Sequence, residues 1–172
     1  SSVGVSGFDP VRRELARSIV EKLCSEREVN EKRVQQIVAK TKKELFRKIK
    51  NDGDKICREL KLRNVHPKIR NMMGALRYRY SFAQNQYFHC GEVGHICGLL
   101  AAELNVESLD ARRAGTFHDI GKAMDHSIDG GHAVIGADFI NTWGEDSKIV
   151  HAVRAHHYDE PPSSDLAYLV IA

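Results

Sequence analysis

Hydrophobic positions in the first part of the chain repeat with the period of an amphipathic helix. The residues at every fourth position are apolar, namely Val11, Leu15, Ile19 and Leu23. Residues at this spacing fall on one face of a helix. Asp9 precedes Pro10, and a capping carboxylate followed by proline is typical of a helix start. The pattern therefore predicts a first helix that begins at residue 10.

A second amphipathic helix is predicted to follow, with Asn30 as its capping residue. Its apolar face comprises Val34, Ile37, Val38, Leu45 and Ile49. The polar stretch Asn-Asp-Gly-Asp at 51–54 predicts a break, after which Ile56 and Leu60 resume the pattern. Two amphipathic helices without a compact core of their own indicate an arm, a dimerisation element, or both, over residues 10–65.

Apolar and small residues become denser from residue 66 onward. The stretch 91–105 predicts a buried helix marked by Val93, Ile96, Leu99, Leu100 and Leu104. Further helices are predicted over residues 108–120, 130–143 and 145–157, and from residue 165 onward. A short strand and a turn are predicted at 2–10, and no later segment alternates convincingly. The expected fold class is all-α, a helical bundle over 66–172 preceded by an amphipathic helical arm.

The composition is that of a soluble protein with one well-buried domain. The chain has 172 residues, of which 42% are hydrophobic and 28% are charged. No apolar run approaches the roughly 18 to 20 residues of a membrane helix, and no signal peptide is visible. The 4 cysteines form no Cys-x-x-Cys pair. We therefore expect reduced thiols in a cytoplasmic fragment.

Charge is distributed unevenly along the chain. Residues 1–70 hold 19 Lys and Arg against 10 Asp and Glu, whereas residues 71–172 hold 7 against 13. A basic segment beside an acidic, histidine-rich one suits a polyanion that docks next to a metal site. On its own, however, the basic segment is better explained as a solvated helix face.

Histidines recur in an ordered series across the second half. The series is His89, then His118-Asp119, then His132, then His156-His157, with each group on a separate predicted helix. A lone histidine in an apolar helix is more often a core residue than a ligand, but a series of this kind is hard to obtain by chance. A carboxylate can bridge two metal ions, with histidines at the outer positions. We therefore predict that these residues bind divalent metal, and that Asp119 is the bridging ligand.

The donor types narrow the choice of metal. Imidazole and carboxylate together suit Mn²⁺, Fe²⁺, Ni²⁺ or Zn²⁺, whereas Mg²⁺ favours more oxygen ligands. Adjacent helical residues point about 100° apart, so His118 and Asp119 can converge only if a helix ends there, and Gly121 makes such an end plausible. Lys122 is expected to contact a phosphate oxygen. His66 and His95 are given no metal role.

The series resembles the HD superfamily of metal-dependent phosphohydrolases, and within it the ribonuclease Y family. The stretches that carry the resemblance are SGFDPVRRELA, FAQNQYFHCGEVGHICGLLAAELN, RAGTFHDIGKAMDHSIDGGHAVIGA and AVRAHHYDE. The resemblance covers nearly the whole chain, from about residue 3 to residue 172. The resemblance implies that residues 1–9 are the remnant of an RNA-binding KH domain, 10–65 the connector, and 66–172 a C-terminally truncated HD domain.

The resemblance also implies an activity and a ligand set. The activity is that of a homodimeric endoribonuclease that cuts single-stranded RNA in bacterial mRNA decay, with two divalent ions (Mn, Mg, Fe, Ni or Zn). The implied metal ligands are His89, His118, Asp119, His132, His156 and His157. Of these, His118 and Asp119, together with Lys122, are the expected catalytic residues, and Glu92 is a supporting one. Other RNA-decay enzymes are expected partners, and the full-length protein is expected at the inner face of the cell membrane through an N-terminal anchor.

The sequence departs from the family pattern at three places. Cys90 stands where serine is common, and Gln86-Tyr87-Phe88 replaces smaller apolar residues, so that access to the pocket is expected to differ. The family's final metal aspartate is expected beyond the stretch DLAYLVIA that ends the sequence. The membrane anchor, the coiled coil and nearly all of the KH domain are also expected outside it.

Two other functions compete with the ribonuclease. The first is an HD phosphohydrolase that acts on nucleotides or cyclic dinucleotides. The Gly-Tyr-Pro signature of cyclic-di-GMP phosphodiesterases is absent, since YDEPPSSD stands in its place, and the basic arm favours a polymer. The second is a non-catalytic dimerisation module. Motifs of Ser-nucleophile, P-loop and dinucleotide-binding enzymes are missing from the sequence.

Overall fold

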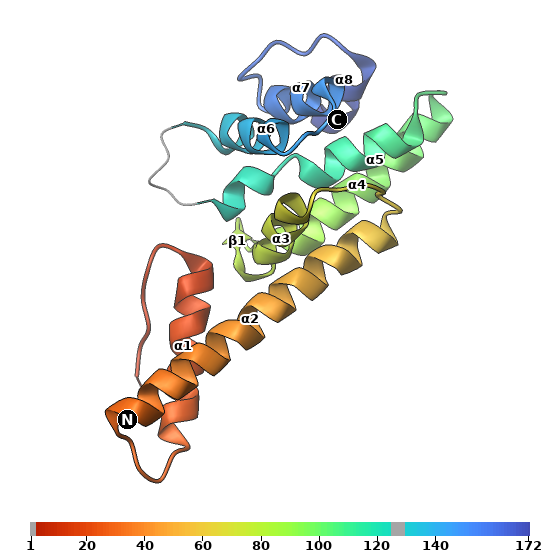
Figure 1. Cartoon of the computed structure of the whole chain (residues 1–172). Coiled ribbons are helices and arrows are strands. Elements are labelled where there is room, and N and C mark those ends of the chain that lie inside the picture. The colour runs from red at the N-terminus through yellow and green to blue at the C-terminus, as the bar shows by residue number, and fades with distance from the viewer. Residues whose placement is uncertain (1–2, 125–129) are drawn as a thin grey trace.

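The computed structural model describes residues 3–124 and 130–172. Figure 1 shows a helical body with an arm that extends from it, and the N-terminus lies at the far end of the arm. The described elements are helical apart from one two-stranded hairpin, so the all-α prediction is confirmed. Within the described residues, no helix combines the length and the apolar composition needed to cross a membrane.

Helices α1 (Pro10–Cys24) and α2 (Glu31–Glu59) form the arm. The predicted caps are both present. Asp9 Oδ1 accepts hydrogen bonds from the amides of Val11 and Arg12, and Asn30 Oδ1 accepts one from Arg33. The predicted strand in the first residues is wrong, because residues 3–7 have no regular structure. Among the described residues, no strand lies beside this segment to satisfy its backbone groups.

The predicted break at 51–54 is also wrong, because α2 continues through Gly53. Gly53 serves instead to let α3 (Pro67–Ala75) cross closely. A Cβ atom on Gly53 would lie 1.8 Å from the carbonyl oxygen of Arg70, and one on Gly74 of α3 would lie 1.9 Å from that of Ile49. Two glycines thus allow backbone-to-backbone packing, which local sequence patterns do not reveal.

A short connection leads from α3 to the body. It comprises the 3-10 turn η1 (Leu76–Tyr78) and the antiparallel strands β1 (Tyr80–Ser81) and β2 (Gln84–Asn85). Helix α4 (Gln86–Glu103) follows at once, with Asn85 as its N-cap. The Asn85 side chain accepts a hydrogen bond from the Tyr87 amide at 3.2 Å. The hairpin is therefore attached directly to the first turn of α4.

The face of α4 that packs against the core is not the face that the sequence predicted. Its large apolar residues are exposed, with Ile96 at 46% and Leu99 at 52%. The buried face carries small residues, because α5 (Ser108–Phe117) packs very close to it. A Cβ atom on Gly94 would lie 2.1 Å from Thr116 Oγ1, and one on Gly115 would lie 2.7 Å from Cys97 Sγ. Small side chains therefore set this interface, and the large ones are left outside.

The remaining elements surround α5 on the other side (Figure 1). They are the 3-10 turn η2 (Ile120–Ala123) and the helices α6 (His132–Thr142), α7 (Ser147–Ala155) and α8 (Asp165–Ile171). The predictions of helices in these three stretches are confirmed. The predicted helix over 108–120 ends earlier, at Phe117.

One hydrophobic core runs from the C-terminal part of α2 to α8. Its large side chains below 2% exposure are Ile69, Met73, Leu76, Phe117, Ile120, Ile140, Ile149 and Val153. The 4 cysteines are free, as predicted. Phe117 and Ile120 flank the site described below, so the same packing that forms the core fixes the position of His118 and Asp119.

We predict that Gly74→Ala destabilises the chain by about 2 to 3 kcal/mol, because the new methyl group would overlap the α2 backbone. Gly91→Ala is the matched control, since its Cβ atom would meet only the Ile56 side chain, with Cδ1 at 3.6 Å and Cγ1 at 3.9 Å. This control should be neutral or stabilise by up to about 1 kcal/mol through helix propensity. Urea denaturation of the two variants measures both effects. Equal stability of the two would contradict the close crossing.

Candidate metal centre

The His118-Asp119 pair lies at the point where α5 ends. His118 is the C-cap of α5, and Asp119 has φ −103° and ψ 13° before η2 begins. This break lets the two side chains converge, with His118 Nε2 at 3.2 Å from Asp119 Oδ2. Gly121 does not act as the predicted helix cap. It allows α6 to pack closely, because a Cβ atom at this position would lie 2.0 Å from the carbonyl oxygen of His132.

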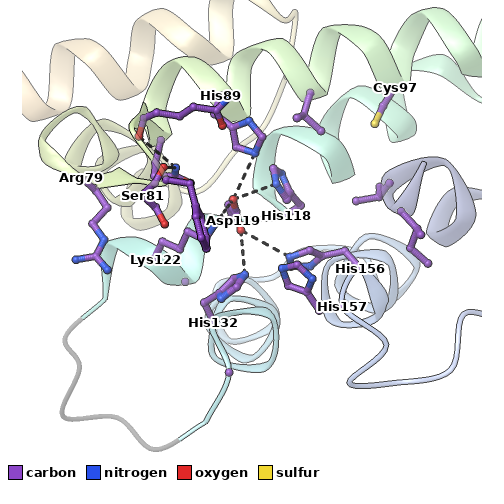
Figure 2. Close-up of a pocket in the computed structure, with 18 of the residues that line it drawn as sticks. Arg79, Ser81, His89, Cys97, His118, Asp119, Lys122, His132, His156 and His157 are labelled. Carbon is purple, nitrogen blue, oxygen red and sulfur yellow. Dashed lines mark hydrogen bonds and ion pairs between the residues drawn. The ribbon is translucent and has the colours of Figure 1, made fainter.

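Four imidazoles surround the Asp119 carboxylate, which is 1% exposed (Figure 2). Oδ2 lies 3.5 Å from His89 Nε2 and 3.2 Å from His118 Nε2. Oδ1 lies 3.0 Å from His132 Nε2 and 3.6 Å from His156 Nε2. Each carboxylate oxygen therefore faces its own pair of histidines. The histidines come from α4, the end of α5, the start of α6 and the end of α7.

The side chains form two groups that could each hold a metal ion, and Asp119 belongs to both. One group is His89, His118 and Asp119, and the other is Asp119, His132, His156 and His157. In each group, one ligand atom per residue lies within 4.8 Å of the others. The His157 ring is 4.9 Å from that of His132 and 4.2 Å from that of His156. The structure thus brings together the six residues singled out from the sequence, and their role as ligands stays a prediction.

Backbone carbonyls fix the tautomers of two histidines. His118 Nδ1 lies 2.8 Å from the carbonyl oxygen of Gly115, and His156 Nδ1 lies 2.6 Å from that of Val153. A carbonyl oxygen only accepts, so each Nδ1 carries the proton and donates. Each Nε2 then has a free lone pair directed toward Asp119. This is the arrangement in which histidine binds a metal ion.

Several converging polar atoms are buried without a hydrogen-bond partner among the described residues. They are Asp119 Oδ1, His132 Nε2 and His156 Nε2. Buried polar atoms without a partner cost free energy. A carboxylate oxygen and an imidazole lone pair are both acceptors, so they cannot satisfy one another, whereas a cation between them can. The donor set therefore fits a divalent ion that accepts nitrogen and oxygen ligands.

Electrostatics keep the site in its metal-binding protonation state. Burial raises the pKa of Asp119, whereas His118, His132 and His156 lower this pKa when their Nε2 atoms are protonated and donate to the carboxylate. A cation held between the groups lowers the pKa of Asp119 in the same direction. Burial, together with repulsion from His118, lowers the pKa of His89. Lys122 Nζ donates a hydrogen bond of 2.6 Å to Asp119 Oδ2 and so adds a positive charge at the edge of the site.

Other histidines lie outside the centre. His95 is exposed on α4, as expected for a residue without a metal role. His66 caps α3 and stacks on Trp143, with ring centroids 4.6 Å apart. His151 is held by Glu160 and Ser163. His126 lies outside the described residues, and Glu92 is exposed, with no ion-pair partner among the described residues.

The centre opens into a cavity of about 830 Å³. One wall carries the metal-ligand candidates and Lys122, and the opposite wall is apolar, formed by residues of α4 and α8. These apolar residues are Val93, Ile96, Leu100, Leu169 and Val170. Sequence reasoning missed this wall because it treated the apolar side chains of α4 as core. Cys90 is fully buried and does not line the cavity, whereas Gln86 does.

Comparison with known proteins agrees with this geometry. The family model of the HD domain matches residues 87–171. Ribonuclease Y 2 of Bdellovibrio bacteriovorus is 60% identical over 99% of this chain, which spans 32% of that protein. Proteins named ribonuclease Y from Pelobacter propionicus and Geobacter sulfurreducens are 48% and 46% identical over 99% of this chain. The chain spans about a third of the length of these curated relatives. No solved structure matches it.

We predict that affinity for Mn²⁺ is constant from pH 8 to about 6.5 and falls below that value. The ordinary histidine pKa is 6.5, and burial lowers the pKa of both His89 and His157 below it. These imidazoles therefore stay neutral through the upper range, and protons compete with metal only at lower pH. Isothermal titration calorimetry at a series of pH values measures the profile. A steep loss between pH 8 and 7 would contradict the lowered pKa values.

Proposed function

This chain belongs to the HD domain family and is homologous over 99% of its length to proteins named ribonuclease Y, and from that premise we propose that it is the catalytic part of a metal-dependent endoribonuclease. Its substrate is single-stranded RNA, and its role is in bacterial mRNA decay. The observation that carries the proposal is the position of Asp119, whose two oxygens face separate groups of histidines at the base of an open cavity.

The residues have distinct roles in this proposal. His89, His118 and Asp119 would hold one ion, and Asp119, His132, His156 and His157 would hold a second. Bound there, the ions would supply an activated water and stabilise charge on the phosphate oxygens. The carbonyls behind His118 and His156 keep the Nε2 lone pairs directed inward. His118, Asp119 and His156 form the buried base of the site, whereas His157 is exposed at its edge.

Lys122 has two roles in the proposed reaction. Its hydrogen bond orients the Asp119 carboxylate, and its charge lies at the cavity wall. A lysine ammonium is a compact positive charge that binds phosphate oxygens well. In the proposal, Lys122 holds a non-bridging oxygen of the scissile phosphate and stabilises the negative charge that develops there.

The exposed basic surface of α2 supports a polymeric anion as substrate. Six cations lie within residues 40–50, namely Lys40, Lys42, Lys43, Arg47, Lys48 and Lys50, and each of them is exposed. None of them forms an ion pair with a described residue. The single acid of the segment, Glu44, pairs with Lys22 of α1. The surface we call the basic stripe therefore carries charge that is available to a phosphate backbone.

The first test is cleavage of a 5′-labelled single-stranded RNA with Mn²⁺ or Mg²⁺. We expect Asp119→Ala to lower the rate by at least about a thousandfold, since it removes a ligand of both ions. Metal analysis should show two ions per chain in the wild type and a loss of both in Asp119→Ala. His95→Ala, which changes a histidine outside the centre, should retain both the ions and the rate.

The same test is run on a version extended at its C-terminus with the residues of the relatives. Metal-dependent cutting of RNA by either form supports the proposal. Hydrolysis of mononucleotides or cyclic dinucleotides without RNA cleavage by either form would replace the ribonuclease with a nucleotide phosphohydrolase. If neither form bound metal or cut any phosphodiester, the chain would be interpreted as a non-catalytic dimerisation module.

A second prediction concerns the basic stripe. The triple variant Lys43→Ala/Arg47→Ala/Lys50→Ala should bind single-stranded RNA more weakly, and the slope of log affinity against log salt should fall by about 2, at about 0.7 for each cation removed. The matched control replaces three cations that pair with acids, namely Arg33, Lys55 and Lys148. Fluorescence anisotropy between 50 and roughly 300 mM salt measures both. Equal slopes for the two triple variants would show that the basic stripe does not contact the RNA.

A further inference from the structure

The hairpin before α4 has an unusual turn. Its strands pair Tyr80 with Asn85 and Ser81 with Gln84, so the loop has only two residues, Phe82 and Ala83. Both have a positive φ, 49° for Phe82 and 63° for Ala83. This is the pattern of a type I′ turn, which strongly favours Asn-Gly at these positions. A bulky residue with positive φ is a true outlier, so the turn stores strain.

Packing does not compensate for this strain. Phe82 is 96% exposed, which is the largest value among the exposed large hydrophobic residues of the described chain. Because the ring is almost fully exposed, the fold does not use it for packing, and both of its faces are available to another molecule. Strained residues of this kind cluster at ligand-binding sites. Phe82 is also part of the wall of the metal-centre cavity, together with Ser81 and Gln84.

The hairpin is held firmly against the centre. Gln86 is 2% exposed, and its Nε2 lies 3.4 Å from the carbonyl oxygens of both Ser81 and Gln84. The Gln86 amide donates to the carbonyl oxygen of Arg79 at 2.9 Å. His89 follows Gln86 by three residues on the same helix, so the turn and the metal-ligand candidate are parts of one rigid unit. Phe82 therefore has a fixed position relative to the site of cleavage.

Two cations line the cavity together with Phe82, and further exposed rings lie on the hairpin and on α4. Arg79 and Lys122 line the same cavity, and Figure 2 shows both on the hairpin side of Asp119. Tyr80 of the hairpin is 66% exposed. Phe88 is 58% exposed, and the Arg77 guanidinium lies 4.4 Å from the centroid of its ring. Exposed aromatic side chains beside cations are the combination that binds single-stranded nucleic acid, because bases stack on the rings while the cations contact the phosphates.

We propose that Phe82 stacks on one base of a single-stranded RNA and so positions the adjoining phosphate over the metal centre. The inference rests on the proposed function and deepens it by naming a positioning residue for the polymer. A stacking contact accepts every base, because each has a π face. Phe82 would therefore hold the RNA strand in place without selecting a base sequence.

Binding of a fluorescein-labelled single-stranded RNA, measured in EDTA, tests the proposal without any cleavage. Phe82→Ala should bind about tenfold more weakly, and Phe82→Trp should bind as tightly as the wild type. Phe82→Asn removes the ring but tolerates a positive φ, so it should melt at the same or a higher temperature and still bind about tenfold more weakly. Phe8→Ala, which removes a ring that is 86% exposed on the arm side, is the matched control and should not change affinity.

RNAs with a single abasic nucleotide, placed at each position in turn, locate the stacked base. One position should weaken binding to the wild type by about tenfold and cause no further loss in Phe82→Ala. Full affinity of Phe82→Ala and Phe82→Asn, with wild-type RNA cleavage intact, would overturn the stacking role and leave the ribonuclease standing. RNA binding that depends on Phe82, without metal-dependent cleavage, would support the inference and overturn the proposed activity. A wild type that neither binds nor cuts RNA would overturn both.

Discussion

The structure depends on one buried carboxylate that is surrounded by acceptors. Asp119 lies among four imidazoles, and the tautomers of His118 and His156 are fixed so that lone pairs face its oxygens. Such an arrangement is unfavourable unless a cation lies between the groups. Among the described residues, Lys122 is the side chain that donates a hydrogen bond to the Asp119 carboxylate. The fold therefore leaves the repulsion between these acceptors largely in place. The histidines that meet this requirement come from the end of α5, the start of α6 and the end of α7.

Close packing makes that convergence possible. Glycines at the contact of α4 with α5, and Gly121 against α6, allow backbones to approach within distances that a methyl group would prevent. The helices that carry His89 and His132 are thereby brought to opposite sides of Asp119. Large side chains displaced from the α4–α5 interface form one wall of the cavity. The same small residues thus position the metal-ligand candidates and shape the cavity beside them.

Local signals in the sequence predicted the parts that depend on local chemistry. The caps Asp9 and Asn30 satisfy amides within three residues, so their effect can be seen in the sequence itself. The histidine series was recognised because each member has a distinctive donor atom. Gly53, the exposed face of α4 and the strained turn at Phe82 could not be predicted in this way. Gly53 and the face of α4 depend on neighbours that are distant in sequence, and the turn at Phe82 has a backbone conformation that its residues do not favour.

The continuity of α2 has a mechanical consequence. A helix of 29 residues is about 43 Å long, and its crossing with α3 at Gly53 and Gly74 leaves no hinge between the arm and the body. In the proposed function, the basic stripe and Asp119 therefore keep a constant distance from one another. An RNA bound at both would be cut at a fixed number of nucleotides from the stripe, independently of its sequence.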